Sequence, residues 1–203
     1  MKKAKNLFQT WTKNMVLYGL DAGLGQFFMN APETSCLYQL GNFIFPAGQV
    51  DPNLWQEFSK KYSLADKVII SEEPSWQEFL DSQSELQQFT RYAFADRADF
   101  DTEALEKWRS RLPANYHLCP IDKESYERLA EEIWSQDLQG AFYDFDHFQA
   151  EGSFGFLVYS GEDIIAGVST GLVYHGALEI EIATNPAYQR QGLAKILGVQ
   201  MIL

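Results

Sequence analysis

The sequence predicts a mixed α/β fold with two domains, the second of which is built around a mainly antiparallel sheet. Over residues 153–184, three strand-like segments follow one another and are joined by short glycine-containing turns, a pattern typical of an antiparallel meander. Over residues 1–112, amphipathic helical spacing alternates with short apolar runs, which indicates a smaller α/β domain. Pro113 lies between the two patterns. We therefore predict one domain at 1–112 and a second at 113–203.

The composition is that of a globular protein able to bury a core. The chain has 203 residues, of which 46% are hydrophobic and 15% aromatic. It contains no run of eighteen apolar residues, and its N-terminus lacks an apolar signal segment. Cys36 and Cys119 are far apart and only three histidines accompany them, which supports neither a disulfide framework nor a metal site. We expect a soluble cytoplasmic protein without a metal.

The net charge of −12 argues against nucleic acid or an anionic membrane as a partner. The charge is uneven: residues 113–203 carry 4 Lys/Arg against 13 Asp/Glu, whereas residues 1–112 carry 12 against 15. An acidic second domain favours a cationic ligand. The alternative is that the acidic surface only keeps the protein soluble.

In the first domain, most predicted helices begin at a capping residue or a proline. Asp51 with Pro52 is a typical helix start, Pro74 opens another helix, and Asp101 caps a third. We expect helices over 4–18, from Pro52, from Pro74 and after Asp101, and strands at 26–29, 35–40, 43–45, 68–70 and 85–94.

The second domain is expected to begin with a strand at Tyr116–Ile121. Asp122 then caps a helix whose apolar stripe extends to Trp134. We expect strands at 153–159, 164–174 and 177–184 and a final helix from Gly192.

One stretch organises this domain: a strand ending in Asn185-Pro186, a loop at Gln189–Ala194, and an apolar helix. Proline ends the strand because it lacks the N–H that a ladder needs. Loop N–H groups and the positive end of the helix dipole together attract an anion. Glycine and alanine at 192 and 194 let a phosphate approach the backbone closely. The alternative is an ordinary strand–turn–helix without a ligand.

This stretch resembles motif A of the GNAT N-acetyltransferases, with the pattern Gln/Arg-x-x-Gly-x-Gly/Ala after a strand that ends in Asn-Pro. The resemblance implies a GNAT acyl-CoA N-acyltransferase fold and acetyl-CoA as co-substrate, with loop amides on its pyrophosphate. It also implies a β-bulge in the preceding strand, at Ile182–Thr184, whose backbone pairs with the pantetheine. The implied cofactor-binding residues are Ile182, Ala183, Thr184, Gln189, Arg190, Gln191, Gly192, Leu193 and Ala194. The N-terminal part resembles a GNAT subgroup that includes proteins of the zwittermicin-resistance type.

Two carboxylates are the candidate catalytic groups. Glu179 and Glu181 are two residues apart, so on a regular strand they share one face with Ala183. On a central strand covered on both sides, burial and mutual repulsion would raise the pKa of at least one toward the range useful for a general base. The family often places a glutamate base in this strand. The choice between the two remains open, and pairing with structural cations is the alternative for both.

Residues 137–151 mix aromatic and acidic side chains, including Phe142, Tyr143, Phe148 and His147. In the GNAT family this region lines the acceptor pocket. The alternative is a second amphipathic helix whose aromatic side chains are core, with His147 at the surface.

The sequence stops within the helix that begins near Gly192. By comparison with the family, the C-terminal part of the GNAT fold is expected to be absent after this third helix, including the tyrosine that often protonates the thiolate. Leu193, Ile196, Leu197 and Met201 would then stay exposed, and we expect a homodimer through this helix edge.

The resemblance predicts an N-acetyltransferase that moves an acetyl group from acetyl-CoA to a primary amine of a small, cationic acceptor. The alternative is a non-catalytic acyl-CoA-binding or interaction module, inactive because part of the site is missing.

Overall fold

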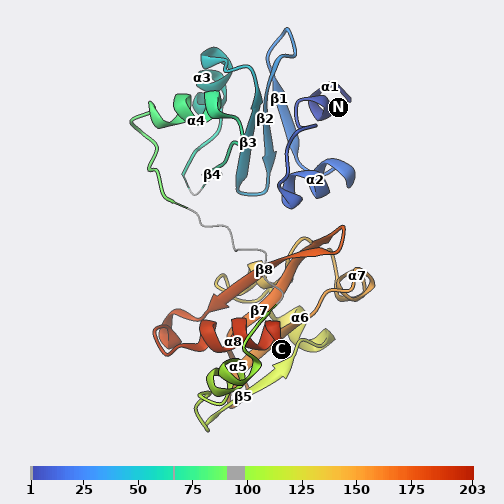
Figure 1. The fold of residues 1–203 in the computed structure, drawn as a ribbon, viewed down its shortest axis with the longest axis vertical. Helices are drawn as coiled ribbons and strands as arrows, with labels where there is room; N and C mark the ends of the chain where they lie inside the picture. The colour runs from blue at the N-terminus through green and yellow to red at the C-terminus, as the bar shows by residue number, and fades with distance from the viewer. Residues whose placement is uncertain (1, 66, 91–98) are drawn as a thin grey trace. The chain divides into compact units, whose positions relative to one another are not determined.

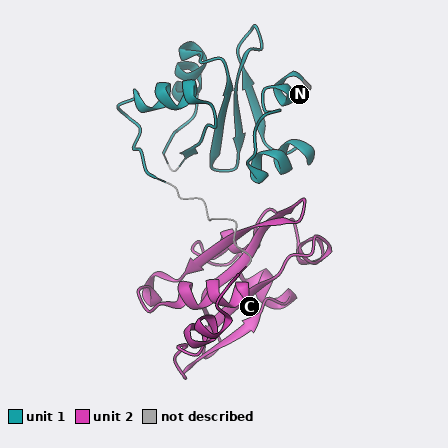
Figure 2. Cartoon of the chain, viewed as in Figure 1, with its two compact units in different colours: residues 1–93 teal, residues 94–203 magenta. Residues whose placement is uncertain are grey.

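The computed structural model describes residues 2–65, 67–90 and 99–203. The chain forms two compact units, Met1–Ala93 and Phe94–Leu203, each with its own four-stranded sheet (Figure 2). The α+β fold class predicted from the sequence is confirmed.

The first unit is a sheet of order β1-β2-β3-β4 with helices on both faces (Figure 1). Its strands are β1 (Gln26–Met29), β2 (Ser35–Leu40), β3 (Phe43–Gly48) and β4 (Val68–Ile69). The first three pair antiparallel, and β4 pairs parallel to β3. Tyr38 and Phe45 pack on one face with the side chains around α1 (Lys2–Asn6) and α2 (Asn14–Asp21). Leu37 and Ile44 pack on the other face with α3 (Pro52–Lys61) and α4 (Pro74–Asp81).

The single helix predicted over residues 4–18 is wrong, because α1 ends at Asn6 and α2 begins at Asn14. The carboxylate of Glu72 accepts hydrogen bonds from the Thr12 N–H (2.8 Å) and hydroxyl (2.9 Å). These bonds replace helical ones. Phe8 and Trp11 keep their apolar role, since both are buried. The strand expected at 85–94 is not formed at residues 85–90, and residues 91–94 lie outside the described residues.

The second unit confirms the predicted antiparallel meander. Its strands β5 (Tyr116–Pro120), β6 (Gly155–Ser160), β7 (Asp163–Tyr174) and β8 (Ala177–Thr184) pair antiparallel in that order. One face packs against α8 (Leu193–Ile202) and α5 (Thr102–Arg109). The other face packs against α6 (Lys123–Arg128), the 3-10 helix η1 (Gln136–Gln139) and α7 (Phe145–Ala150).

The helix after Asp122 is shorter than its apolar stripe suggested. Asp122 and Ser125 form the capping box of α6, but α6 ends at Arg128. Ile133, which we expected on the buried stripe, is 89% exposed. Leu129 is buried as predicted.

The two units divide after Ala93, whereas the sequence placed the boundary at 112/113. The difference arises from α5, which packs against α8 and therefore belongs with the second unit. Leu112, just after α5, joins the same apolar cluster as Leu193 and Leu197. Among the described residues, no helix has the length and apolarity that a bilayer crossing needs.

Candidate functional site

The strand β8 presents two chemically different faces. Ile182 lies on the α8 face, since its Cδ1 is 3.8 Å from the position a Cβ would take at Gly198. Ala183 packs on the opposite face with the cluster around Leu157. Alternation therefore puts Glu179 and Glu181 on the face of Ala183, as predicted from the sequence.

The strand β8, which carries Glu179 and Glu181, does not lie in the centre of the described sheet, where the sequence predicted it. In the described residues β8 is the last strand, so it is an edge strand and not a central strand covered on both sides. Glu179 and Glu181 are accordingly only half-buried. The apolar side chains on the other face are partly exposed: Leu178 39%, Ile180 46% and Ile182 43%. The prediction that β8 is a central strand covered on both faces, with its glutamates deeply buried, is therefore wrong.

A bulge lies beneath Glu181, on the neighbouring strand. The β7–β8 register shifts at Gly171, while pairing is regular over Ile182–Thr184, so the bulge expected there is not found in this ladder. The carbonyl of Gly171 accepts a hydrogen bond from Ala141 N at 2.7 Å, which ties the bulge to the segment after η1. A Cβ at Gly171 would lie 3.0 Å from Cγ of Glu181. The missing side chain at Gly171 therefore makes room for Glu181.

The loop after β8 has the backbone geometry of an anion site. Asn185 caps the short turn by accepting from Ala187 N at 3.0 Å. Arg190 (φ 62°) and Gly192 (φ 80°) are both left-handed, which turns the chain sharply into α8. No side chain caps α8, and a Cβ at Gly192 would meet nothing within 4 Å. The first N–H groups of α8 thus have no partner from a capping side chain among the described residues.

Two cations lie beside this helix start, and sequence reasoning missed them. Nζ of Lys195 is 3.4 Å from the ring centroid of Trp108, and Cζ of Arg111 is 3.8 Å from the same ring. The hydroxyl of Tyr116 donates to Oε1 of Gln191 at 3.1 Å, which fixes the loop to β5. The only sequence signal was Lys195, which directly follows the loop in a strongly acidic domain. The predicted boundary at 112/113 places Trp108 and Arg111 in the first domain, away from this loop.

The aromatic passage is divided between core and surface. Phe142 and Phe148 are buried, which agrees with the core alternative. Tyr143 is 81% exposed and stacks on His147 with ring centroids 3.9 Å apart. Nε2 of His147 is 3.7 Å from Oε1 of Glu151, and its buried Nδ1 has no hydrogen-bond partner among the described residues. His147, on α7, is therefore a partly buried side chain and not a fully exposed one.

The expected exposure of α8 is wrong. Leu193, Ile196, Leu197 and Met201 are all buried, at 2%, 3%, 0% and 9% exposure. Sheet side chains such as Val158, Ile165 and Val168 cover Leu193, Leu197 and Met201 from one side. The exposed apolar surface lies instead on β8 and on Ile202 and Leu203, which are 45% and 43% exposed.

The antiparallel sheet therefore leads from its edge strand through a left-handed glycine into an uncapped helix N-terminus, a feature that favours anions in general. A model of the GNAT acetyltransferase family matches residues 5–203, and the chain therefore belongs to the GNAT acetyltransferase family. Acetyl-CoA is the usual acyl donor of this family. Among the described residues, no group of three or more His, Cys, Asp or Glu side chains is arranged to hold a metal ion.

One solved structure supports the same assignment. The chain is similar to a GCN5-related N-acetyltransferase-like protein from Streptococcus suis 89/1591, with 26% identity and a TM-score of 0.78 over 99% of this chain and 83% of that chain. A GCN5-related N-acetyltransferase from Kribbella flavida is 12% identical over 92% of this chain and 76% of that chain, with a TM-score of 0.47. No significant match to a curated protein was found.

Proposed function

We propose that this chain is an N-acetyltransferase that moves an acetyl group from acetyl-CoA to a primary amine of a small, cationic acceptor. The observation that carries the proposal is the start of α8, where left-handed Gly192 leads into N–H groups that no described side chain caps, in a chain of the GNAT family. We also propose that the N-terminal unit places the chain in the GNAT subgroup that includes proteins of the zwittermicin-resistance type.

The residues at this helix start fit the phosphates of acetyl-CoA. Loop residues Gln189–Ala194 would hold the pyrophosphate through backbone N–H groups, which favour an anion at the positive end of the helix. The edge of β8 that faces away from β7 has no strand partner among the described residues. Backbone groups of Ile182, Ala183 and Thr184 along that edge would pair with the extended pantetheine. Bound acetyl-CoA would supply the activated acyl group as a thioester.

The chain's own task is then to position the amine and accept its proton. The amine nitrogen forms a bond to the thioester carbonyl carbon, the carbon–sulfur bond breaks, and the amine loses one proton. Glu179 and Glu181 lie two residues apart on the strand that also leads to the loop, so either carboxylate can accept this proton directly or through a water. Both also add to the negative charge of the second unit, which favours a cationic acceptor.

A free-thiol assay with acetyl-CoA and a panel of primary amines tests the enzyme against the alternative, a non-catalytic acyl-CoA-binding module. We expect thiol release that depends on both the chain and an amine, and a product heavier by one acetyl group. Burial raises the pKa of Cys36 to about 12, so this thiol contributes little background. Tight CoA binding with no release for any amine would favour the module.

The two cations on Trp108 give a prediction about donor affinity. We expect Lys195→Glu and Arg111→Glu each to raise the KM for acetyl-CoA about threefold to tenfold, because each reverses a charge near the phosphates. The effect should shrink at high salt. Lys107→Glu is the matched control: Lys107 lies on the same helix as Trp108 but pairs with Glu103 at 2.8 Å. An equal effect of all three variants would mean that only the net charge matters.

The exposed apolar surface of β8 supports self-association as part of the proposal. Leu178 and Ile180 lie beside each other on one face, and both are partly exposed, at 39% and 46%. We expect the chain to form a dimer whose population rises with concentration, and Leu178→Lys with Ile180→Lys to return it to a monomer. Light scattering after size exclusion measures this. A wild-type chain that stays monomeric at high concentration contradicts the proposed dimer.

A further inference from the structure

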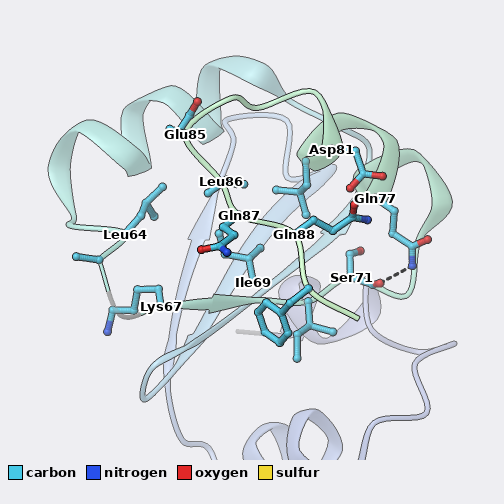
Figure 3. Close-up of a pocket in the computed structure, with 14 residues that line it drawn as sticks. Leu64, Lys67, Ile69, Ser71, Gln77, Asp81, Glu85, Leu86, Gln87 and Gln88 are labelled. Atoms are coloured by element: carbon cyan, nitrogen blue, oxygen red, sulfur yellow. Dashed lines mark hydrogen bonds between the residues drawn. The ribbon is translucent and has the colours of Figure 1, made fainter. Parts of the chain in front are cut away.

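The first unit contains a large pocket that the acetyl-transfer proposal does not use. Its volume is about 970 Å³, at the upper end of the range for ligand sites. It lies beside β4 and is lined by the loop before that strand, by α4 and by residues 85–89 (Figure 3).

One wall of the pocket is the free edge of a sheet. Within the described part of the chain, β4 is the last strand of its sheet and pairs with β3 alone. Val68 N donates to Asn42 O at 2.9 Å and Ile70 N donates to Ile44 O at 3.0 Å. Because alternate residues of a strand point their backbone groups to opposite sides, the N–H and C=O of Ile69 face away from β3. Ile69 lines the pocket, and no described residue uses its outward backbone donor or acceptor.

A second wall carries polar side chains with spare hydrogen-bonding capacity. Gln87 and Gln88 follow α4, and their amide groups have no hydrogen-bond partner within the part of the chain that the structure describes. Leu86, just before them, packs on the core cluster that contains Trp76 and Leu80. The segment is therefore anchored beside the pocket by Leu86, and its two glutamines line the same pocket as Ile69 (Figure 3).

The charges around the pocket favour a cation. Asp81 and Glu85 both line it, and neither has an ion-pair partner within residues 2–65, 67–90 and 99–203. The one basic lining residue, Lys67, is turned toward the β2–β3 turn, where its Nζ lies 3.1 Å from Oδ1 of Asn42. The pocket thus combines apolar lining from Leu64, Leu80 and Leu86 with a strand edge and two carboxylates that have no partner among the described residues.

We propose that this pocket binds an extended peptide segment of a partner protein, with at least one lysine or arginine side chain, as an added strand on the edge of β4. Backbone pairing with Ile69 gives the peptide its direction, and the carboxylates of Asp81 and Glu85 select the basic side chain. The glutamine amides complete the hydrogen bonds on the other side of the peptide. A compact amine would leave the strand edge unused, which is why the observations favour a peptide. This inference is independent of acetyl transfer.

The test uses the full chain and a fluorescein-labelled hexapeptide of alternating valine and lysine, blocked at both ends. We expect saturable binding by fluorescence anisotropy. A peptide with glutamate in place of lysine should bind about tenfold more weakly or not at all. Methylating the backbone nitrogens of the peptide should also abolish binding, because it removes the donors that pair with β4.

Variants of the chain locate the site. Asp81→Asn with Glu85→Gln should weaken the lysine peptide about fivefold to tenfold, while Glu57→Gln, an exposed site on α3, should not. Ile69→Pro removes only the outward N–H and should weaken binding, whereas Ile69→Val should not. The far-UV circular dichroism spectrum and the Tm must be unchanged in all of them, as evidence of folding. Absence of peptide binding, equal binding of the methylated peptide, or equal competition by free lysine amide would each overturn the proposal.

Discussion

Replacing the catalytic base with glutamine is expected to lower kcat by about 10²–10⁴, the usual contribution of general base catalysis. Glutamine keeps the size of glutamate but cannot accept the amine proton. We therefore expect one of Glu179→Gln and Glu181→Gln to show this loss and the other to show a change of less than about tenfold. The affinity for acetyl-CoA should stay within a factor of two in both, because neither side chain lies in the phosphate loop.

Glu162→Gln is the matched control for these variants, because it makes the same charge change at the exposed β6–β7 turn. Steady-state thiol release with a saturating amine gives kcat for all four chains. If both strand variants keep more than a third of wild-type activity, neither glutamate is the base. The space made by Gly171 beneath Glu181 would then be a packing feature only.

Placing a carboxylate at Gly192 is expected to separate folding from cofactor binding. Gly192→Asp puts a negative charge at the start of α8, where it stabilises an empty helix but repels a phosphate. The loss should be about 1–2 kcal/mol, or about fivefold to thirtyfold in the Kd for CoA. The Tm should not fall by more than a few degrees, since a Cβ at this position meets nothing within 4 Å and aspartate tolerates a positive φ better than most residues.

Gly192→Asn supplies the control for this position, because asparagine has nearly the same shape and backbone preference without the charge. We expect it to lose less than half of the binding free energy that Gly192→Asp loses. Calorimetric titration of CoA into the three chains measures the difference. Equal and unreduced affinity in all three would place the phosphate site elsewhere.

Local patterns in the sequence were sufficient to predict most strands of the second unit. Period-two alternation and short turns predicted the order of β6, β7 and β8, and Asn185-Pro186 predicted the end of β8. The start of a helix near Gly192 was also predicted, and α8 begins at Leu193. These features depend on a few neighbouring residues, so the sequence determines them locally.

The errors come from interactions between residues far apart in the sequence. Thr12 leaves the helical pattern because it donates hydrogen bonds to Glu72, which is sixty residues away in the sequence. The packing of α5 on α8 could not be inferred from either helix alone. Because this packing was not predicted, the two cations on the Trp108 ring were not predicted either. The edge position of β8 likewise depends on the whole sheet. Residue spacing within one segment does not predict contacts between segments that are far apart in the sequence.

The most direct test of the account is the position of acetyl-CoA on the folded chain. Backbone amide spectra of the ¹⁵N-labelled protein, recorded while CoA is added, report each loop N–H separately. We predict the largest shifts at Gln191, Gly192, Leu193 and Ala194, with smaller shifts along Ile182–Thr184, in the same titration. Shifts confined to the first unit, or no shifts near the start of α8, would contradict the proposed acetyl-CoA site.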